Sequence, residues 1–117
     1  RLYAENPARN FLPSPGTLED FHLPADMAHC RIDTGVRRGD TITPHYDPMI
    51  AKLIAWGPDR DAARARMGAL LREARIAGLR SNLDFLRAVI DSAAFAAGRV
   101  DTGFIERERA TLLPQST

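Results

Sequence analysis

The stretch Met49-Ile50-Ala51-Lys52-Leu53-Ile54-Ala55-Trp56-Gly57-Pro58-Asp59-Arg60 marks a change in the character of the chain. Its apolar run from residue 49 to 56 predicts a buried strand, which Gly57-Pro58 ends because proline cannot continue a strand ladder. Asp59 can then cap a helix that runs from about Arg60 to Arg75. Strand-like sequence precedes this point and helix-like sequence follows it, and this order predicts an α+β domain.

Two main helices are expected in the second half. The first buries one stripe of side chains three or four residues apart, formed by Ala63, Met67, Leu70, Leu71 and Ala74. Its opposite side carries the charged residues Arg64, Arg66, Arg72 and Glu73. The second helix starts at Ser81, and Asp84 three residues later resembles the partner in a capping box. Its buried stripe consists of Phe85, Leu86, Val89, Ile90 and Ala93.

Glycines mark the ends of both helical regions. Gly78 lies just beyond the first and Gly98 ends the second, where a left-handed residue is favoured. A last short segment, from Thr102 to about Glu106, is expected to dock onto the domain through Phe104 and Ile105.

The first half is extended and rich in turns. Residues 1–4, 17–22 and 30–33 are predicted to form strands. Residues 6–16 are predicted to form an irregular loop, because their prolines and glycine disfavour helix and central strand.

The composition describes one ordinary soluble domain. A chain of 117 residues holds one modest core, and a net charge of +1 with interspersed signs gives no basic face for nucleic acid. The longest apolar run is interrupted by Lys52 and is far shorter than the roughly 20 residues needed to span a membrane. The single cysteine, Cys30, fits a reducing compartment, and 15 Arg against one Lys is typical of GC-rich bacterial genes. A cytoplasmic location is therefore expected.

The residues do not form a self-contained active site. Zinc spacing is absent among the potential ligands His22, His29, Cys30 and His45. Neither Ser14 nor Ser81 lies in a strand–turn–helix elbow, and the glycines are scattered at turns instead of forming a phosphate loop. Lys52 in a buried strand must be paired, snorkelling or facing a cleft, because an unpaired buried charge is costly.

Several ordered blocks resemble the C-terminal subdomain of biotin carboxylases, the ATP-grasp enzymes within biotin-dependent carboxylases. In this sequence they read RLYAENP (1–7), FLPSPG (11–16), DTGVRRGD (33–40), HYDPMIAKLIAWG (45–57), DRDA (59–62), GLRSNLDFL (78–86) and DTGFIE (101–106). The form HYDPMIAKL is similar to the biotin-containing subunit of acyl-CoA carboxylases, and to methylcrotonoyl-CoA carboxylases in particular.

The resemblance implies a fold and a role. Residues 1–107 would form a small antiparallel, barrel-like β unit flanked by two main helices, and residues 108–117 a polar tail or linker. The family uses MgATP and bicarbonate to form carboxyphosphate, which carboxylates the ureido nitrogen of biotin on a carrier domain. Its ATP-grasp lysines and Mg²⁺ ligands lie upstream of the matching segment. This chain would therefore complete the biotin-side wall of the active site, without a metal site of its own, and be inactive alone.

The resemblance also assigns roles to individual residues. Arg1 occupies the position of the arginine that faces the biotin ureido oxygen and carboxyphosphate. Asp47 would lie near the biotin cleft, and Asp101 and Thr102 would approach the adenine of ATP. Arg31 matches a position near the dimer contact of the free-standing bacterial enzyme, although residues 25–29 depart from that enzyme.

Two functional hypotheses follow. The chain is either part of a biotin carboxylase, with the ATP-grasp core, a biotin carrier domain and a carboxyltransferase subunit as partners, or a non-catalytic structural or interaction module of the same fold. The first hypothesis predicts exposed apolar side chains on the surface that packs on the ATP-grasp core.

Overall fold

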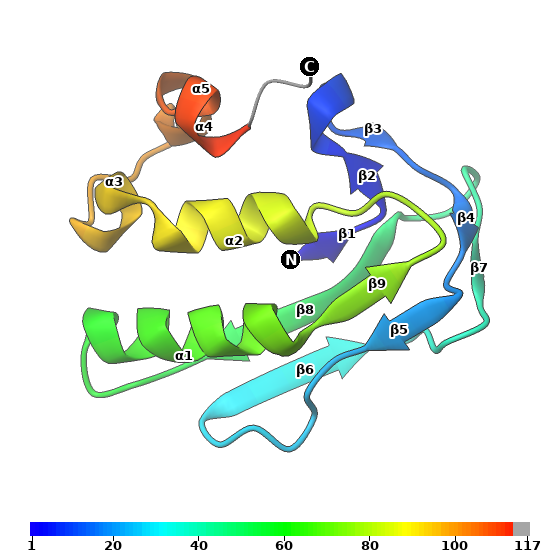
Figure 1. Ribbon diagram of the computed structural model, residues 1–117, viewed down its shortest axis with the longest axis horizontal. Helices are drawn as coiled ribbons and strands as arrows, with labels where there is room; N and C mark the ends of the chain where they lie inside the picture. The colour runs from blue at the N-terminus through cyan, green and yellow to red at the C-terminus, as the bar shows by residue number, and fades with distance from the viewer. Residues whose placement is uncertain (114–117) are drawn as a thin grey trace.

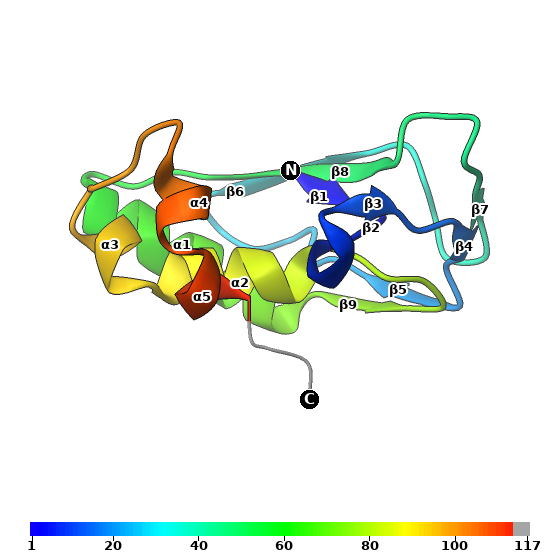
Figure 2. The same ribbon diagram turned by 90° about the horizontal axis from the view of Figure 1, so that it is seen from above.

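A computed structural model describes residues 1–113 of the chain. Short antiparallel sheets form one part of the molecule, and helices lie against one side of the largest sheet (Figures 1 and 2). The predicted α+β class is therefore confirmed.

The largest sheet has three strands in the order β1 (Leu2–Tyr3), β8 (Met49–Ala55) and β6 (Cys30–Thr34). Strand β8 is the central one, as the apolar run predicted, and both neighbours are antiparallel to it. Its register places Leu2 opposite Ala51 and Asp33 opposite Lys52. Lys52 is exposed, so its charge stays in solvent although its strand lies at the centre of the sheet.

Three further antiparallel pairs complete the β part. They are β2 (Glu5–Asn6) with β3 (Leu12–Pro13), β4 (Gly16–Thr17) with β7 (Thr41–Ile42), and β5 (Asp20–His22) with β9 (Arg75–Ala77). Figure 2 shows β5 and β9 on the opposite side from β6 and β8, with β4 and β7 at one end between them. This arrangement is the barrel-like unit that the resemblance implied.

Two main helices flank this unit. The helical elements are η1 (Pro7–Arg9), α1 (Arg60–Glu73), α2 (Leu83–Asp91), α3 (Ala93–Ala96), α4 (Phe104–Arg107) and α5 (Arg109–Leu112). Helix α1 begins where expected, because the Asp59 carboxylate accepts a hydrogen bond of 2.8 Å from the backbone N–H of Ala62. Helices α1 and α2 lie side by side, and α5 packs on α2 (Figure 1).

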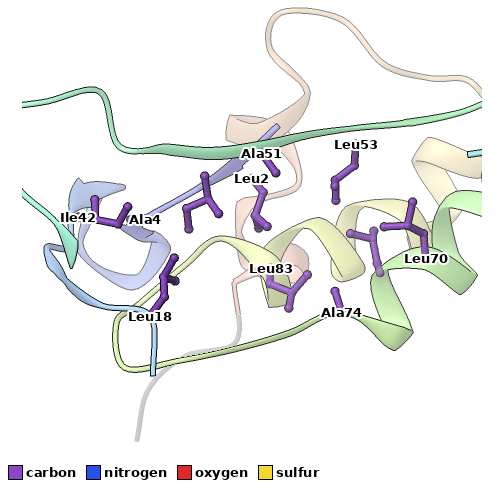
Figure 3. Packing of buried hydrophobic residues seen from close by; sticks show 11 residues of the cluster. Leu2, Ala4, Leu18, Ile42, Ala51, Leu53, Leu70, Ala74 and Leu83 are labelled. Atoms are coloured by element: carbon purple, nitrogen blue, oxygen red, sulfur yellow. The ribbon is translucent and has the colours of Figure 1, made fainter. Parts of the chain in front are cut away.

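The main core lies between the three-stranded sheet and the two helices. Figure 3 shows that Leu2 and Ala51 from the sheet, Leu70 from α1 and Leu83 from α2 converge there. Leu2 and Leu70 have no exposed surface. Burial of each such leucine contributes about 1.5–3 kcal/mol to folding, so the core fixes β1 firmly against β8 and the helices.

A second apolar cluster holds the last helices. It consists of Phe85, Ala94, Phe104 and Leu112. The ring of Phe11 meets Phe85 edge-on at 5.0 Å. The segment predicted as a polar tail from residue 108 contains helix α5, whose Leu112 is buried. Residues 114–117 lie outside the described residues. The expected docking of Ile105 is wrong, since this side chain is 40% exposed.

Several predicted boundaries differ in the β part. The strand predicted over residues 17–22 is divided into β4 and β5, because Leu18 turns into the core between them. The predicted loop over residues 6–16 contains η1 and strand β3. Helix α1 ends at Glu73, since residues 75–77 pair with β5 instead of continuing the helix. Tertiary pairing overrides local helix propensity at this position.

The second main helix begins and ends differently from the prediction. Asn82 occupies the cap position, and Asp84 pairs with Arg87 at 2.9 Å instead of with Ser81. The helix ends at Asp91, and Ser92 starts the separate helix α3. This break buries Ala94 in place of the predicted Ala93.

Candidate substrate-facing side

The first candidate residue, Arg1, directly precedes β1. Leu2 is fully buried, and the backbone N–H of Ala4 donates a hydrogen bond of 2.9 Å to the carbonyl oxygen of Pro48. These contacts fix the strand, whereas Arg1 itself is exposed. An arginine in this position presents a permanent positive charge at the end of a rigid strand.

Asn82 binds the backbone of the segment that carries Arg1. Its side-chain oxygen accepts a hydrogen bond of 2.8 Å from the backbone N–H of Tyr3, and its side-chain nitrogen donates one of 3.1 Å to the carbonyl oxygen of Arg1. Its backbone N–H also donates to the carbonyl oxygen of Tyr3 at 3.1 Å. The sequence prediction missed this residue because Ser81 beside it is an equally good helix cap. An Asn directly after the predicted cap Ser81, and directly before an apolar stripe, was the available signal.

The second candidate segment connects β7 to β8. Asp47 is exposed there, and its carboxylate accepts a hydrogen bond of 2.9 Å from the backbone N–H of Met49. This local bond sets the turn that leads into β8.

The third candidate segment connects α3 to α4. The Asp101 carboxylate accepts hydrogen bonds from the Arg107 guanidinium at 2.8 Å and from the backbone N–H of Gly103 at 2.9 Å. The hydrogen bond from Arg107 and, to a lesser extent, the hydrogen bond from Gly103 hold the pKa of Asp101 below its ordinary value. Thr102 is exposed next to it.

These three segments share one side of the molecule. In Figure 2 the N-terminus, the green β7–β8 connection and the orange α3–α4 connection all lie along the upper side, with the N-terminus between the two connections. The structure thus brings Arg1 and the segments of Asp47 and Asp101 to one side. Arg31 lies separately on β6, where its exposed guanidinium pairs with Asp33 at 2.9 Å.

Exposed apolar side chains lie in or next to the β7–β8 and α3–α4 connections. Tyr46 and Met49, at the entrance to β8, are 78% and 38% exposed. Val100 and Ile105, around the start of α4, are each 40% exposed. Large apolar side chains on a polar domain are typical of a surface that contacts another protein part.

The described residues offer little for a metal or a nucleophile. Among residues 1–113 there is no group of three or more His, Cys, Asp or Glu side chains that could hold a metal ion. A Mg²⁺ site therefore does not fit this segment by itself. Burial raises the pKa of the Cys30 thiol, with a smaller opposing effect of Arg66, so the thiolate is disfavoured. No helix in the described part is long and apolar enough to cross a membrane.

Short antiparallel strand pairs packed against two main helices define the class of this domain as α+β, and Arg1 is exposed at the start of its first strand. A model of the family described as "Biotin carboxylase C-terminal domain" matches residues 1–107, and the chain belongs to this family. It is 48% identical over 117 residues to the mitochondrial methylcrotonoyl-CoA carboxylase subunit alpha of Oryza sativa subsp. japonica. It is 46% identical over 105 residues, 90% of the chain, to the urea amidolyase of Saccharomyces cerevisiae. The chain spans 16% of the rice protein and 6% of the yeast protein.

Solved structures agree with this assignment. The biotin carboxylase subunit of pyruvate carboxylase superposes with a TM-score of 0.93 at 34% identity, over 99% of this chain and 26% of that chain. The biotin carboxylase domain of Hydrogenobacter thermophilus 2-oxoglutarate carboxylase, in complex with MgADP, ADP and bicarbonate, gives a TM-score of 0.92 at 31% identity, over 99% of this chain and 25% of that chain. The predicted family and fold are therefore confirmed.

Proposed function

We propose that this chain completes the biotin-side wall of a biotin carboxylase, which uses MgATP and bicarbonate to carboxylate carrier-bound biotin in an acyl-CoA carboxylase. The observation that carries the proposal is the position of Arg1, exposed at the start of a buried strand and between two connections on one side of the domain. The 48% identity to a methylcrotonoyl-CoA carboxylase subunit supports an acyl-CoA carboxylase as the whole enzyme.

Arg1 is the residue that acts on the substrate in this proposal. Removal of the ureido N–H proton of biotin places negative charge on the ureido oxygen. A fixed guanidinium stabilises that charge through charge-assisted hydrogen bonds, and more strongly in the transition state than in the ground state. Carboxyphosphate, formed from ATP and bicarbonate, supplies the carboxyl group.

The other candidates have supporting positions. Asp47 lies near the biotin cleft and orients a basic group of the ATP-grasp core. Asp101 and Thr102 are assigned to the adenine of ATP, and the position of their connection on the same side as the N-terminus supports this role. Arg31 is assigned to a contact between two biotin carboxylase subunits, and its exposure on β6 supports this role.

The partners in this proposal are the ATP-grasp core, the biotin carrier domain and the carboxyltransferase subunit. Mg²⁺ is held by the ATP-grasp core, since the described residues lack a metal-binding group. The exposed Tyr46, Met49, Val100 and Ile105 support an enzyme part over a free-standing module, because the core would cover them. The Arg-rich composition supports a bacterial cytoplasm, although the rice and mouse relatives are mitochondrial proteins.

The test is Arg1→Ala in a full-length biotin carboxylase that carries this segment. We expect carboxybiotin formation to fall by about 10²–10³-fold, the typical cost of losing one donor to a developing oxyanion. Arg9→Ala is the matched control, because Arg9 is also an exposed arginine in the N-terminal segment but lies in η1. Near-normal carboxybiotin formation by Arg1→Ala would remove Arg1 from the mechanism.

A further inference from the structure

Among residues 1–113, Asn82 is the one polar or charged residue that is almost fully buried, with 5% of its surface exposed. Burying an amide costs free energy unless its hydrogen-bonding groups find partners. Asn82 directs them away from its own helix, since its side chain makes no capping bond to α2. Both side-chain bonds go instead to residues about 80 positions earlier, the N–H of Tyr3 and the carbonyl oxygen of Arg1.

These bonds take the place of the hydrogen bonds that a second neighbouring strand would make with β1. Strand β1 lies at the edge of its sheet, with β8 on one side only. A neighbouring strand would bond both the N–H and the C=O groups along the free edge of β1. Asn82 supplies both kinds of partner. Its side-chain amide accepts a hydrogen bond from the N–H of Tyr3 and donates one to the C=O of Arg1. Its backbone N–H donates a third bond to the C=O of Tyr3.

One of the three bonds reaches the backbone of Arg1 itself. Leu2 and Ala4 are already held by burial in the core, so the strand needs no further support there. The carbonyl group of Arg1 accepts this bond next to the carbon atom that carries the exposed side chain. The amide therefore fixes the peptide plane from which the guanidinium extends.

We propose that Asn82 is a positioning residue, which holds the backbone of Arg1 so that the guanidinium meets the biotin ureido oxygen. The inference rests on the proposed role of Arg1. It deepens that role, because a catalytic donor is effective only when it is fixed before the reaction. A displacement of about 1 Å at such a group can lower the rate by roughly 100-fold.

The experiment separates the two half-reactions in the full-length carboxylase. Bicarbonate-dependent ATP hydrolysis reports carboxyphosphate formation, and carboxybiotin formed per ATP hydrolysed reports transfer to biotin. We expect Asn82→Ala to lower this ratio roughly 10- to 100-fold while ATP hydrolysis per folded enzyme is retained. A general loss of folded protein would lower both rates together and leave the ratio unchanged, which would overturn the proposal.

A second variant covers the case in which Asn82→Ala does not fold. Asn82→Asp retains the acceptor for Tyr3, but its ionised carboxylate has no proton to donate to the carbonyl oxygen of Arg1. Protonation would restore a donor of the same shape. The transfer ratio of Asn82→Asp, normalised to wild type at each pH, should therefore recover as the pH falls. A flat normalised profile, or a wild-type ratio at all pH values, would contradict the proposal.

A double-mutant cycle distinguishes the failure of this inference from failure of the proposed function. If Asn82 acts through Arg1, adding Asn82→Ala to Arg1→Ala should lower the transfer ratio by less than twofold further. A normal ratio in Arg1→Ala alone would refute the role of Arg1. A defective Arg1→Ala with a normal Asn82→Ala, or full additivity, would refute only the role of Asn82. Arg87→Ala is the control, because it weakens the domain without touching β1.

Discussion

The guanidinium of Arg87 on α2 donates a hydrogen bond of 2.9 Å to the carbonyl oxygen of Ala74 at the end of α1. It also donates one of 2.8 Å to the carbonyl oxygen of Leu71. Arg64 on α1 makes the reciprocal contact, at 2.7 Å, to the carbonyl oxygen of Ile90 near the end of α2. Each helix thus receives a cation at its C-terminal carbonyl groups, where unpaired oxygens and the helix dipole favour positive charge.

Loss of the first of these contacts should destabilise the domain. We expect Arg87→Ala to lower the free energy of unfolding by about 2 kcal/mol, because two buried carbonyl groups lose a charged donor. Urea unfolding of the purified chain measures this change. Arg75→Ala is the control: its pair with Asp20, at 3.4 Å between exposed side chains, should contribute less than about 1 kcal/mol. Equal effects of the two substitutions would contradict the role of the helix ends.

Gly78 is expected to tolerate no side chain. Its φ is +104°, and an added Cβ would lie 2.0 Å from the carbonyl oxygen of Thr17. Gly78→Ala should therefore cost about 2–4 kcal/mol, the sum of backbone strain and displacement of the neighbouring strand. Gly35→Ala is the matched control, since a Cβ at Gly35 would meet nothing within 4 Å. Thermal unfolding of both variants tests the difference, and a wild-type melting temperature for Gly78→Ala would refute it.

Burial at the start of β1 gives a third prediction. Leu2→Ala should lower the free energy of unfolding by about 2–5 kcal/mol, because Leu2 is fully buried and its removal leaves a cavity. Leu12→Ala should have little effect, since this leucine is 58% exposed. Chemical denaturation of the two variants provides the comparison. Similar losses for both would mean that β1 is not anchored through the core.

The Asp101 carboxylate gives a pH prediction. Its pKa is lowered in the folded protein, so the stability that it contributes is present above the unfolded pKa and is lost as the pH falls through the folded pKa. Arg107→Ala should raise the pKa of Asp101 towards its ordinary value. An NMR titration of the side-chain carboxyl carbon measures this pKa. Arg109→Ala is the control, because Arg109 pairs with Glu106 instead, and an unchanged pKa in Arg107→Ala would contradict the assigned cause.

The spacing of apolar residues predicted the elements that are long or that are bounded by clear capping or strand-breaking residues. Strand β8 and helix α1 follow from one apolar run, a Gly-Pro break and the Asp59 cap. The pattern missed β7 and β9, since strands of two or three residues have no periodicity and depend on partners far along the chain. It also placed Arg64 on the solvent side of α1, because the sequence does not show that α2 packs there.

The candidate site was predictable only in part. Blocks such as RLYAENP and HYDPMIAKL identified Arg1 and Asp47 by resemblance. Asn82 was missed, since its importance arises from the partners Arg1 and Tyr3 across about 80 residues. Composition cannot show that a short edge strand is completed by a single amide.

The long separation between β1 and Asn82 has a consequence for biosynthesis. A ribosome that adds 5–20 residues per second needs about 4 to 16 seconds to extend the nascent chain from Tyr3 to Asn82, 79 positions later. During that time the backbone groups of Arg1 and Tyr3 lack their partner Asn82. The arginine therefore reaches its final geometry late in translation, only after the segment that begins α2 has emerged.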